Sequence, residues 1–365
     1  MWYKTSDEAK LITPTLLLFP DRIRKNIQTM IELAGDARRL RPHVKTHKMA
    51  PVINMQQEAG ISKFKCATLS EANLLLNEGV EDVLIAMPLV GAVQDRFISM
   101  VKEHPATKLS LLVDDIGQLI LLNNKAKKTN INISFFLDID VGMHRTGISA
   151  KPARKIIDAL PDLPNVNFKG LHVYDGHIRN TNFEQRKRRS DEAFKDVELL
   201  IDYIKTKNIE IAELICGGSP SFPIHAQYSE RVLSPGTALI WDQGYGTILP
   251  DIPFIHAGVI LTRIISKPGD DLICIDLGHK AIASEMTHPR IHLFGIDNYE
   301  VKSHSEEHLV LEIRDPEKYE IGQVIYGIPY HICPTVALHE QVAVIENGKL
   351  TEFWNVEARK RIYEV

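Results

Sequence analysis

Short apolar runs alternate with amphipathic segments through the first two thirds of the chain. Runs that end in turn residues predict β-strands at residues 43–45, 63–67, 82–86, 108–113, 133–138, 168–173, 213–216 and 237–241. Residues 21–35 predict a helix, because apolar side chains recur on one face and Gly35 follows as a C-terminal cap. Eight strands that alternate with helices predict an α/β fold, a parallel (β/α)8 barrel of the TIM type over residues 20–244.

The pattern changes near residue 245. Short strands with turn signals follow, including the hairpin-type turn Asn347-Gly348, and the pattern shows no clear helices. We therefore expect a mostly-β second domain over residues 245–365. Residues 1–19 are assigned to the same domain, because 16–19 form an apolar run that can add a strand to its sheet.

Composition and charge narrow the class of protein. The net charge of −4 gives no reason to expect nucleic acid or an anionic membrane as a partner, and no apolar run is long enough to span a membrane. The N-terminus lacks the apolar core of a signal peptide, and four cysteines in 365 residues do not make a disulfide framework. We expect a cytoplasmic enzyme with reduced thiols.

A cluster of basic residues lies at the first predicted strand, in the stretch from Arg41 to Lys48. In a barrel, chemistry is carried at the C-terminal ends of the strands, and Lys45 ends this strand. A lysine walled by apolar barrel residues loses hydration, which lowers its pKa and supplies the free amine that forms a Schiff base. His43 belongs to the setting of Lys45. The alternative is a solvated basic loop.

Two other strand ends carry candidate side chains. Residues 138–147 contain two glycines that permit tight turns, and Arg145 there is expected to face the barrel mouth. The alternative is a structural turn. After residues 168–173, Tyr174 is placed to stack on an aromatic cofactor, and His177 is a candidate acid or base near neutral pH. The alternative is a core tyrosine with a loop histidine.

A glycine-rich turn follows the seventh predicted strand. Gly217 and Gly218 leave backbone N–H groups free to form an anion nest, and Ser219 adds a hydroxyl donor. A phosphate site at the loops after strands 7 and 8 is a recurrent feature of barrels. The alternative is a plain Gly-Gly turn.

The second domain contains one pair of metal-binding residue types. His331 and Cys333 are expected to share one face of an extended segment. An imidazole nitrogen and a thiolate suit Zn²⁺ or a similar metal, and two protein ligands leave room for an open catalytic site. The alternative is an accidental His-x-Cys spacing.

These motifs, in this order along most of the chain, resemble the D-threonine aldolase / D-serine dehydratase family. These are fold-type III pyridoxal-phosphate enzymes related to alanine racemases. The resemblance implies that Lys45 is the Schiff-base lysine, that Arg145 and Tyr174 lie beside the cofactor, and that the 217–219 turn holds its phosphate. It also implies that His331 and Cys333 bind a divalent metal (Zn, Mn or Mg) and that the enzyme is a homodimer.

The family implies chemistry on D-β-hydroxy amino acids, and the substrate is expected to be a small-molecule amino acid. The leading hypothesis is retro-aldol cleavage of D-threonine-like substrates to glycine and an aldehyde, with His177 as the base for the hydroxyl proton. The alternatives are a D-serine or D-3-hydroxyaspartate dehydratase, an amino-acid racemase, and a barrel that binds the cofactor without catalysis.

Two departures leave the subfamily open. Ser234 stands where alanine racemases often have arginine before Pro-Gly. Cys333 is typical of the dehydratase branch, whereas the following Pro334-Thr335-Val336 is aldolase-like. A thiolate ligand makes the metal a weaker Lewis acid, which favours alkoxide chemistry over hydroxide expulsion.

Overall fold

The computed structural model describes residues 1–296 and 298–364. The chain forms two compact units. The β unit comprises Met1–Thr29, Thr46–Val52 and Thr237–Arg359, and the barrel unit comprises Met30–Lys45, Ile53–Gly236 and Lys360–Val365. Helices α1 (Pro20–Ala34) and α2 (Ala50–Glu58) each carry the chain from one unit to the other.

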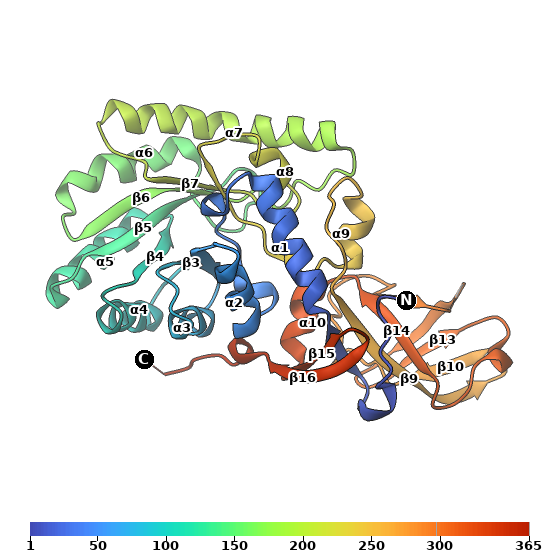
Figure 1. The fold of residues 1–365 in the computed structure, drawn as a ribbon. Coiled ribbons are helices and arrows are strands. Elements are labelled where there is room, and N and C mark those ends of the chain that lie inside the picture. Colours follow the sequence, from blue (N-terminus) through green and yellow to red (C-terminus); the bar gives the residue numbers. More distant parts are fainter. Residues whose placement is uncertain (297, 365) are drawn as a thin grey trace. The chain divides into compact units, whose positions relative to one another are not determined.

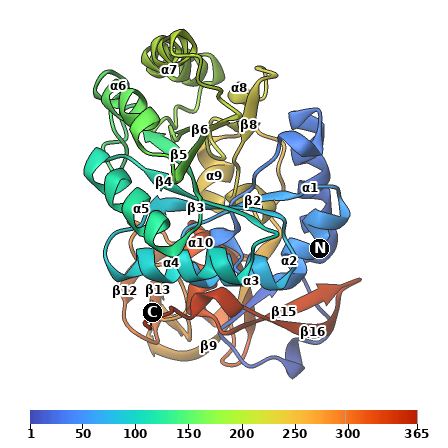
Figure 2. The same ribbon diagram turned by 90° about the vertical axis from the view of Figure 1, so that its left-hand side faces the viewer.

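Seven parallel strands form the sheet of the barrel unit, in the order of the sequence: β2 (Lys63–Cys66), β3 (Asp82–Pro88), β4 (Lys108–Val113), β5 (Ile133–Ile139), β6 (Val166–Val173), β7 (Glu213–Cys216) and β8 (Arg231–Leu233). Parallel neighbours need crossover connections, which are helical here. The helices are α3 (Leu69–Asn77), α4 (Ala92–Glu103), α5 (Ile116–Thr129), α6 (Ala150–Ala159), α7 (Phe183–Thr206) and α8 (Phe222–His225). Figures 1 and 2 show these helices along the outside of the sheet.

An irregular segment joins the two edges of this sheet. Leu40 forms a parallel bridge with Leu233 of β8, and His43 forms one with Lys65 of β2. The predicted strand at residues 43–45 is therefore wrong in detail, because Val44–Thr46 is a 3-10 helix. Pro42 explains the short pairing, since proline has no N–H to donate to a ladder.

The eighth predicted strand is also displaced. Residues 237–241 begin with the 3-10 helix Thr237–Leu239, and the last strand of the sheet is β8, six residues earlier in the sequence. Pro235 and Gly236 follow β8 and end it. The prediction mistook the apolar segment beyond this turn for the strand.

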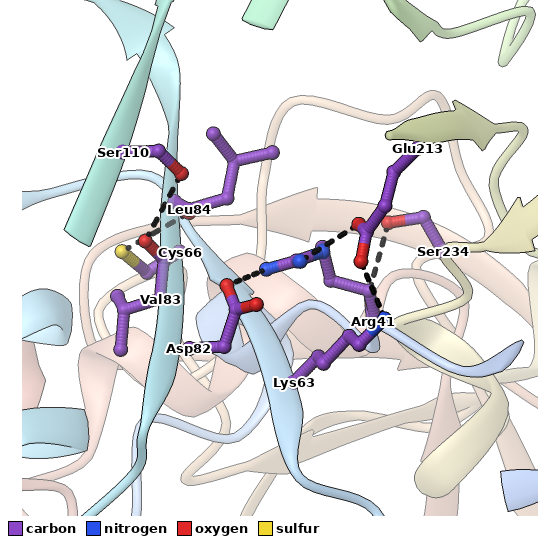
Figure 3. Close-up of polar contacts among 9 residues, drawn as sticks. All are labelled: Arg41, Lys63, Cys66, Asp82, Val83, Leu84, Ser110, Glu213 and Ser234. Carbon is purple, nitrogen blue, oxygen red and sulfur yellow. Dashed lines mark hydrogen bonds and ion pairs between the residues drawn. The ribbon is translucent and has the colours of Figure 1, made fainter. Parts of the chain in front are cut away.

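An ion-pair network closes the N-terminal end of the strands (Figure 3). The side chain of Arg41 is 1% exposed, and its guanidinium contacts Asp82 Oδ1 at 2.7 Å and Glu213 Oε2 at 2.8 Å. Lys63 also pairs with Glu213. Lys63, Asp82 and Glu213 are the first residues of β2, β3 and β7. Arg41 and Lys63 hold the pKa of Glu213 below its usual range, although burial alone would raise it.

The β unit contains a sheet of nine strands within the described residues: β1 (Thr15–Leu18), β9 (Gly258–Gly269), β10 (Leu272–Ile275), β11 (Ile291–Phe294), β12 (Glu300–His304), β13 (Leu309–Glu312), β14 (Val324–Pro329), β15 (Gln341–Glu346) and β16 (Lys349–Asn355). As the apolar run at residues 16–19 predicts, β1 lies in this sheet, antiparallel to β9 and parallel to β15. Asn347 and Gly348 both have positive φ, as a tight β15–β16 hairpin requires.

The prediction that this region lacks helices is wrong. Helix α10 (Ile332–Leu338) lies in it, and helix α9 (Gln243–Ile248) overlaps its start. Asp242 stabilises both, because Oδ1 accepts the N–H of Tyr245 and Oδ2 accepts the N–H of Ile332. Pro334 is tolerated because it falls in the first turn of α10. Among the described helices of the whole chain, none combines the length and apolar content needed to cross a membrane.

Candidate active site

Two lysines lie close to the bridge that joins the segment before β2 to β2 itself. Lys45 follows the bridge between His43 and Lys65 by two residues, and its N–H donates to His43 Nδ1 at 3.2 Å. Lys45 is partly buried, whereas Lys65 on β2 is only 2% exposed. Burial lowers the pKa of Lys65 to about 7, and the positive charge of Lys45 contributes to the shift. The sequence predicts Lys45 and does not single out Lys65.

Lys65 belongs to a buried polar chain inside the barrel. Lys65 Nζ lies 3.2 Å from His172 Nε2, and His172 Nδ1 lies 2.7 Å from Asp138 Oδ1. Thr146 Oγ1 donates to the other carboxylate oxygen of Asp138 at 2.9 Å. In the sequence, the only mark of these hydrogen-bonded residues is that a charged or imidazole side chain stands near the end of each of three apolar strands.

Arg145 and Tyr174 meet beside this polar chain. Arg145 Cζ lies 5.1 Å from the centroid of the Tyr174 ring, and Lys65 Nζ lies 5.7 Å from the same centroid. A small cavity of about 20 Å³ is lined by Arg145 and Tyr174 together with Asp138 and His172. The structure therefore brings two predicted cofactor neighbours together at the C-terminal ends of β5 and β6.

The glycine-rich turn after β7 packs against the same tyrosine. A Cβ on Gly218 would lie 2.7 Å from Tyr174 Cε2, so only glycine fits this contact without displacement of the ring. Ser219 Oγ accepts the N–H of Gly236 at 3.3 Å, which joins the turn after β7 to the turn after β8. The N–H of Gly217 already donates to the carbonyl of Val173 at 2.9 Å, so this amide is not free as the sequence suggests.

A second buried network packs against this turn. Ser221 Oγ donates to Asp175 Oδ1 at 2.5 Å, and His225 Nε2 lies 2.9 Å from Asp175 Oδ2. Arg231 donates to His225 Nδ1 at 2.8 Å, which leaves Nε2 of that ring to donate to Asp175. A Cβ on Gly217 would lie 2.6 Å from His225 Cδ2. The sequence does not reveal this network, because its members are separated by up to 56 residues, from Asp175 to Arg231.

His177 lies beside the loop that follows β5. A Cβ on Gly142 would lie 3.2 Å from His177 Nε2. Within the described part of the chain, His177 Nδ1 is buried and has no hydrogen-bond partner. Burial lowers the pKa of His177, so its neutral, proton-accepting form is favoured at neutral pH.

His331 and Cys333 both lie in the β unit, but not on an extended segment. His331 caps α10 and Cys333 lies in its first turn. Cys333 Sγ lies 3.2 Å from Thr46 Oγ1 and 3.4 Å from Thr237 Oγ1, and His331 Nδ1 contacts Glu285 Oε1. Although burial opposes it, the contact with His331 lowers the pKa of the Cys333 thiol.

This donor pair fits a divalent metal in its chemistry. A thiol with a lowered pKa and an imidazole are borderline-soft ligands, and a carboxylate on Nδ1 is the usual outer partner of a metal-binding histidine. Within residues 1–296 and 298–364, no group of three or more histidine, cysteine, aspartate or glutamate side chains is arranged to hold a metal. Any ion here would have two protein ligands and open positions.

Comparisons with known proteins agree with this architecture. Residues 20–243 match the family "Alanine racemase, N-terminal domain", and residues 257–345 match "Putative serine dehydratase domain". A 3-hydroxy-D-aspartate aldolase of Paracoccus denitrificans is 28% identical over 98% of this chain and 94% of its own length. A D-serine dehydratase of Dictyostelium discoideum is 26% identical over 93% of this chain and 95% of its own length. The crystal structure of a D-threonine aldolase from Filomicrobium marinum superposes with a TM-score of 0.87, at 27% identity and 96% coverage of both chains.

The chain belongs to the alanine racemase N-terminal domain family. Its α/β fold, with parallel barrel strands and a mostly-β C-terminal region, is the one that the sequence predicts. The predicted likeness to D-threonine aldolases and D-serine dehydratases is also confirmed.

Proposed function

We propose that this protein is a pyridoxal-phosphate- and divalent-metal-dependent lyase that cleaves D-β-hydroxy amino acids to glycine and an aldehyde. Residues 20–244 are the proposed cofactor domain, and residues 1–19 with 245–365 the proposed metal-carrying domain. The observation that carries the proposal is the convergence of Lys65, Arg145, Tyr174 and the 217–219 turn at the C-terminal ends of the barrel strands. Lys45 follows by two residues His43, which forms a bridge with Lys65.

The barrel residues fit the cofactor. Lys45 supplies the amine that binds its aldehyde carbon, and His43 orients the backbone of Lys45 through the Nδ1 contact. The turn of Gly217, Gly218 and Ser219, in which Gly218 lets the backbone approach the Tyr174 ring, is proposed to hold the phosphate. When bound, pyridoxal phosphate supplies an electron sink for charge that develops at the substrate α-carbon.

Arg145 and Tyr174 are proposed to fix the cofactor ring. The guanidinium of Arg145 places positive charge over the Tyr174 ring, where it can bind an anionic oxygen of the cofactor. Gly218 packs against the same tyrosine ring, which a Cβ at this position would displace. These contacts exclude alternative ring positions at the strand ends.

His331 and Cys333 are the residues proposed to hold the metal. Their nitrogen and sulfur donors favour Zn²⁺, with Mn²⁺ or Mg²⁺ as weaker matches. A bound ion would lower the pKa of a coordinated substrate hydroxyl. His177 is the proposed base for that hydroxyl proton, because its neutral form is favoured and its Nδ1 is free to accept within the described structure. Thr46, which contacts Cys333, directly follows Lys45 in the sequence.

A dehydratase is the second candidate, favoured by the match of residues 257–345 to a putative serine dehydratase domain and by Cys333. In that reaction Lys45 would remove the α-proton and the β-hydroxyl would leave. A racemase would need a second base and no metal pair, so we rank it lower.

One assay separates these candidates. The purified enzyme is incubated with D-threonine, D-serine and D-3-hydroxyaspartate, with and without chelator, and the products are identified. Glycine and an aldehyde from a D-β-hydroxy substrate, lost with chelator, are expected. A keto acid and ammonia would exclude the aldolase.

We further propose a homodimer in the cytoplasm. The chain mass is 41.2 kDa, so light scattering coupled to size exclusion should give about twice this value. A monomer that turns over substrate at the same concentration would contradict this.

A further inference from the structure

We propose that a cavity at the N-terminal ends of the barrel strands is a binding site for a small organic anion with an apolar body, such as an aromatic carboxylate. The cavity has a volume of about 640 Å³, and all the residues that line it belong to the barrel unit. This volume lies within the range of about 300–1,000 Å³ that is typical of small-molecule sites. The proposed reaction does not use this cavity, so the site does not depend on the proposed function.

Small side chains leave the cavity open. Bulky residues usually fill the interior of a barrel, and here they form one apolar layer, which consists of Leu84, Leu112, Phe136, Ile215 and Val232. Ser110 and Ser134 precede two of these residues by two positions, so they lie on the same face of their strands, one layer nearer the N-terminal ends. The two serines are also neighbours in the parallel register. Side chains of this size cannot fill the layer, and both serines line the cavity.

The apolar layer separates the cavity from the polar residues of the proposed active site. Phe136 and Arg41 both line the cavity, and Arg41 Cζ lies 5.8 Å from the centroid of the Phe136 ring. Asp138, two residues further along β5, lines the small cavity at the C-terminal ends instead. A ligand in the larger cavity would therefore bind apart from the residues proposed to hold pyridoxal phosphate.

The charges around the cavity favour an anion. The two carboxylates in its wall, Asp82 and Glu213, are compensated by the ion-pair network of Figure 3. Three lysines also line the cavity, namely Lys102, Lys108 and Lys169. Within the described residues, none of the three has an ion-pair partner. Positive charge therefore remains uncompensated at this end of the barrel, and a bound anion would balance it.

A β-bulge brings one of these lysines to the cavity. The register of β5 and β6 shifts by one residue, which leaves Lys169 between Phe168 and Gly170 without a partner on β5. Bulges commonly redirect a side chain next to a functional site. Lys169 is partly buried, so water would screen an anion beside it less than an anion beside a fully exposed lysine.

Apolar side chains supply a surface for the body of the ligand. Val101, Leu109 and Ile131 line the cavity together with Phe136. A bare inorganic ion would leave this surface in contact with water, whereas an aromatic or aliphatic body would bury it. The hydroxyl of Ser134 makes no hydrogen bond within the described part of the chain, so it is available to the ligand.

Photolabelling with 4-benzoylbenzoate tests the site directly. This probe is a carboxylate with an apolar aromatic body, and on irradiation it attaches to C–H bonds that it contacts. Full-length protein is irradiated with increasing concentrations of the probe, and labelled peptides are identified by mass spectrometry. We expect saturable labelling within residues 101–110 or 131–136. Labelling by benzophenone, which lacks the carboxylate, should be about tenfold weaker.

Variants test the contribution of the lysines and of the space between them. Lys108→Glu and Lys169→Glu should each raise the half-saturating concentration by about tenfold, because each replaces an attraction for the carboxylate by a repulsion. Lys25→Glu, at an exposed position of α1, is the matched control and should label as wild type does. Ser134→Phe places a bulky ring in the cavity and should abolish labelling. If this variant does not fold, the two lysine variants decide the test.

Three results would overturn the proposal. The first is the absence of saturable labelling, or labelling that maps outside these two segments. The second is the same half-saturating concentration for wild type and both lysine variants. The third is loss of labelling when pyridoxal phosphate is added, which would place the probe in the proposed active site. Turnover of amino acids is not measured, so failure of the proposed function would leave these results unchanged.

Discussion

At the scale of single residues, burial decides what each lysine of the barrel can do. Lys63 is partly exposed and pairs with Glu213, whereas Lys65, two residues later on the same strand, is buried against an imidazole. Lys45 lies in the 3-10 helix Val44–Thr46 and is partly buried. Lys45, Lys63 and Lys65, all within 21 residues, thus have three different surroundings.

The sequence identifies residues at strand ends better than residues inside the barrel. Arg145, Tyr174 and Gly218 are predicted because turn residues mark the ends of strands, and the structure brings these three together. Lys65 and His172 are missed because they lie in the parts of β2 and β6 that are buried on both faces. Such strands show no alternation, so the sequence does not tell which side chains point inward.

Gly218→Ala should weaken cofactor binding while the protein stays folded. The new methyl group would lie 2.7 Å from Tyr174 Cε2 and push the ring out of place. We expect a loss of about tenfold in affinity for pyridoxal phosphate, or about 1.4 kcal/mol, measured by titration of apoprotein. Gly269→Ala, whose methyl would meet only a leucine side chain at 3.3 Å, is the control. If the two variants bind pyridoxal phosphate with equal affinity, Gly218 is not part of the cofactor site.

At the scale of elements, the predicted pattern is right where periodicity is strong. The helix predicted over residues 21–35 is α1, and the apolar runs at 108–113 and 213–216 are β4 and β7. The errors fall where local chemistry overrides periodicity. Pro42 restricts pairing of the segment before Lys45 to isolated bridges, and α10 is a short helix held by the Asp242 carboxylate rather than by its own pattern.

The pairing of β6 with β7 depends on Gly170. Its φ is +144°, and a Cβ there would lie 1.9 Å from the carbonyl oxygen of Glu213. Gly170→Ala must therefore separate two central strands, and we expect a loss of about 3 kcal/mol in the free energy of unfolding, measured in urea. Gly79→Ala, at φ +70° with open space around it, adds only the strain of a left-handed residue and no contact, so its loss should be about 1 kcal/mol. If the two variants lose similar free energies of unfolding, the contact between strands at Gly170 does not cause the loss.

At the scale of the whole molecule, the two ends of the barrel strands have different roles: one stabilises the fold and the other carries the proposed active site. The N-terminal ends carry the closed ion-pair network of Figure 3, in which Arg41 and Lys63 balance Asp82 and Glu213. A cavity of about 640 Å³ lies at this end, lined in part by Arg41, Asp82 and Glu213. The C-terminal ends carry the proposed site, as barrels generally do.

Arg41→Met should destabilise the protein strongly at neutral pH. The substitution removes the ion pairs of Arg41 with Asp82 and Glu213 and leaves the pair of Lys63 with Glu213, and loss of one member of a buried pair costs about 3–5 kcal/mol. Chemical denaturation at pH 7 measures the loss. A loss of less than about 1 kcal/mol in the free energy of unfolding would show that solvent screens this network as it screens an exposed ion pair.

The pH dependence of that loss has a definite sign. The pKa of Glu213 is lower in the folded than in the unfolded chain, so its stabilisation is present above the unfolded pKa of about 4.3 and is lost as pH falls through the folded value. The difference in stability between wild type and Arg41→Met should therefore shrink as pH falls below about 4.3. A constant difference would exclude charge as its cause.

The most direct test of the account is the fate of Lys45. Wild-type protein loaded with pyridoxal phosphate and reduced with borohydride should carry the cofactor on Lys45 in peptide mass spectra, and should show the visible absorbance band of lysine-bound cofactor before reduction. Lys45→Ala should lose both signals, together with cleavage of D-β-hydroxy amino acids. Attachment to another lysine in wild type, or cleavage that survives in Lys45→Ala, would contradict the account.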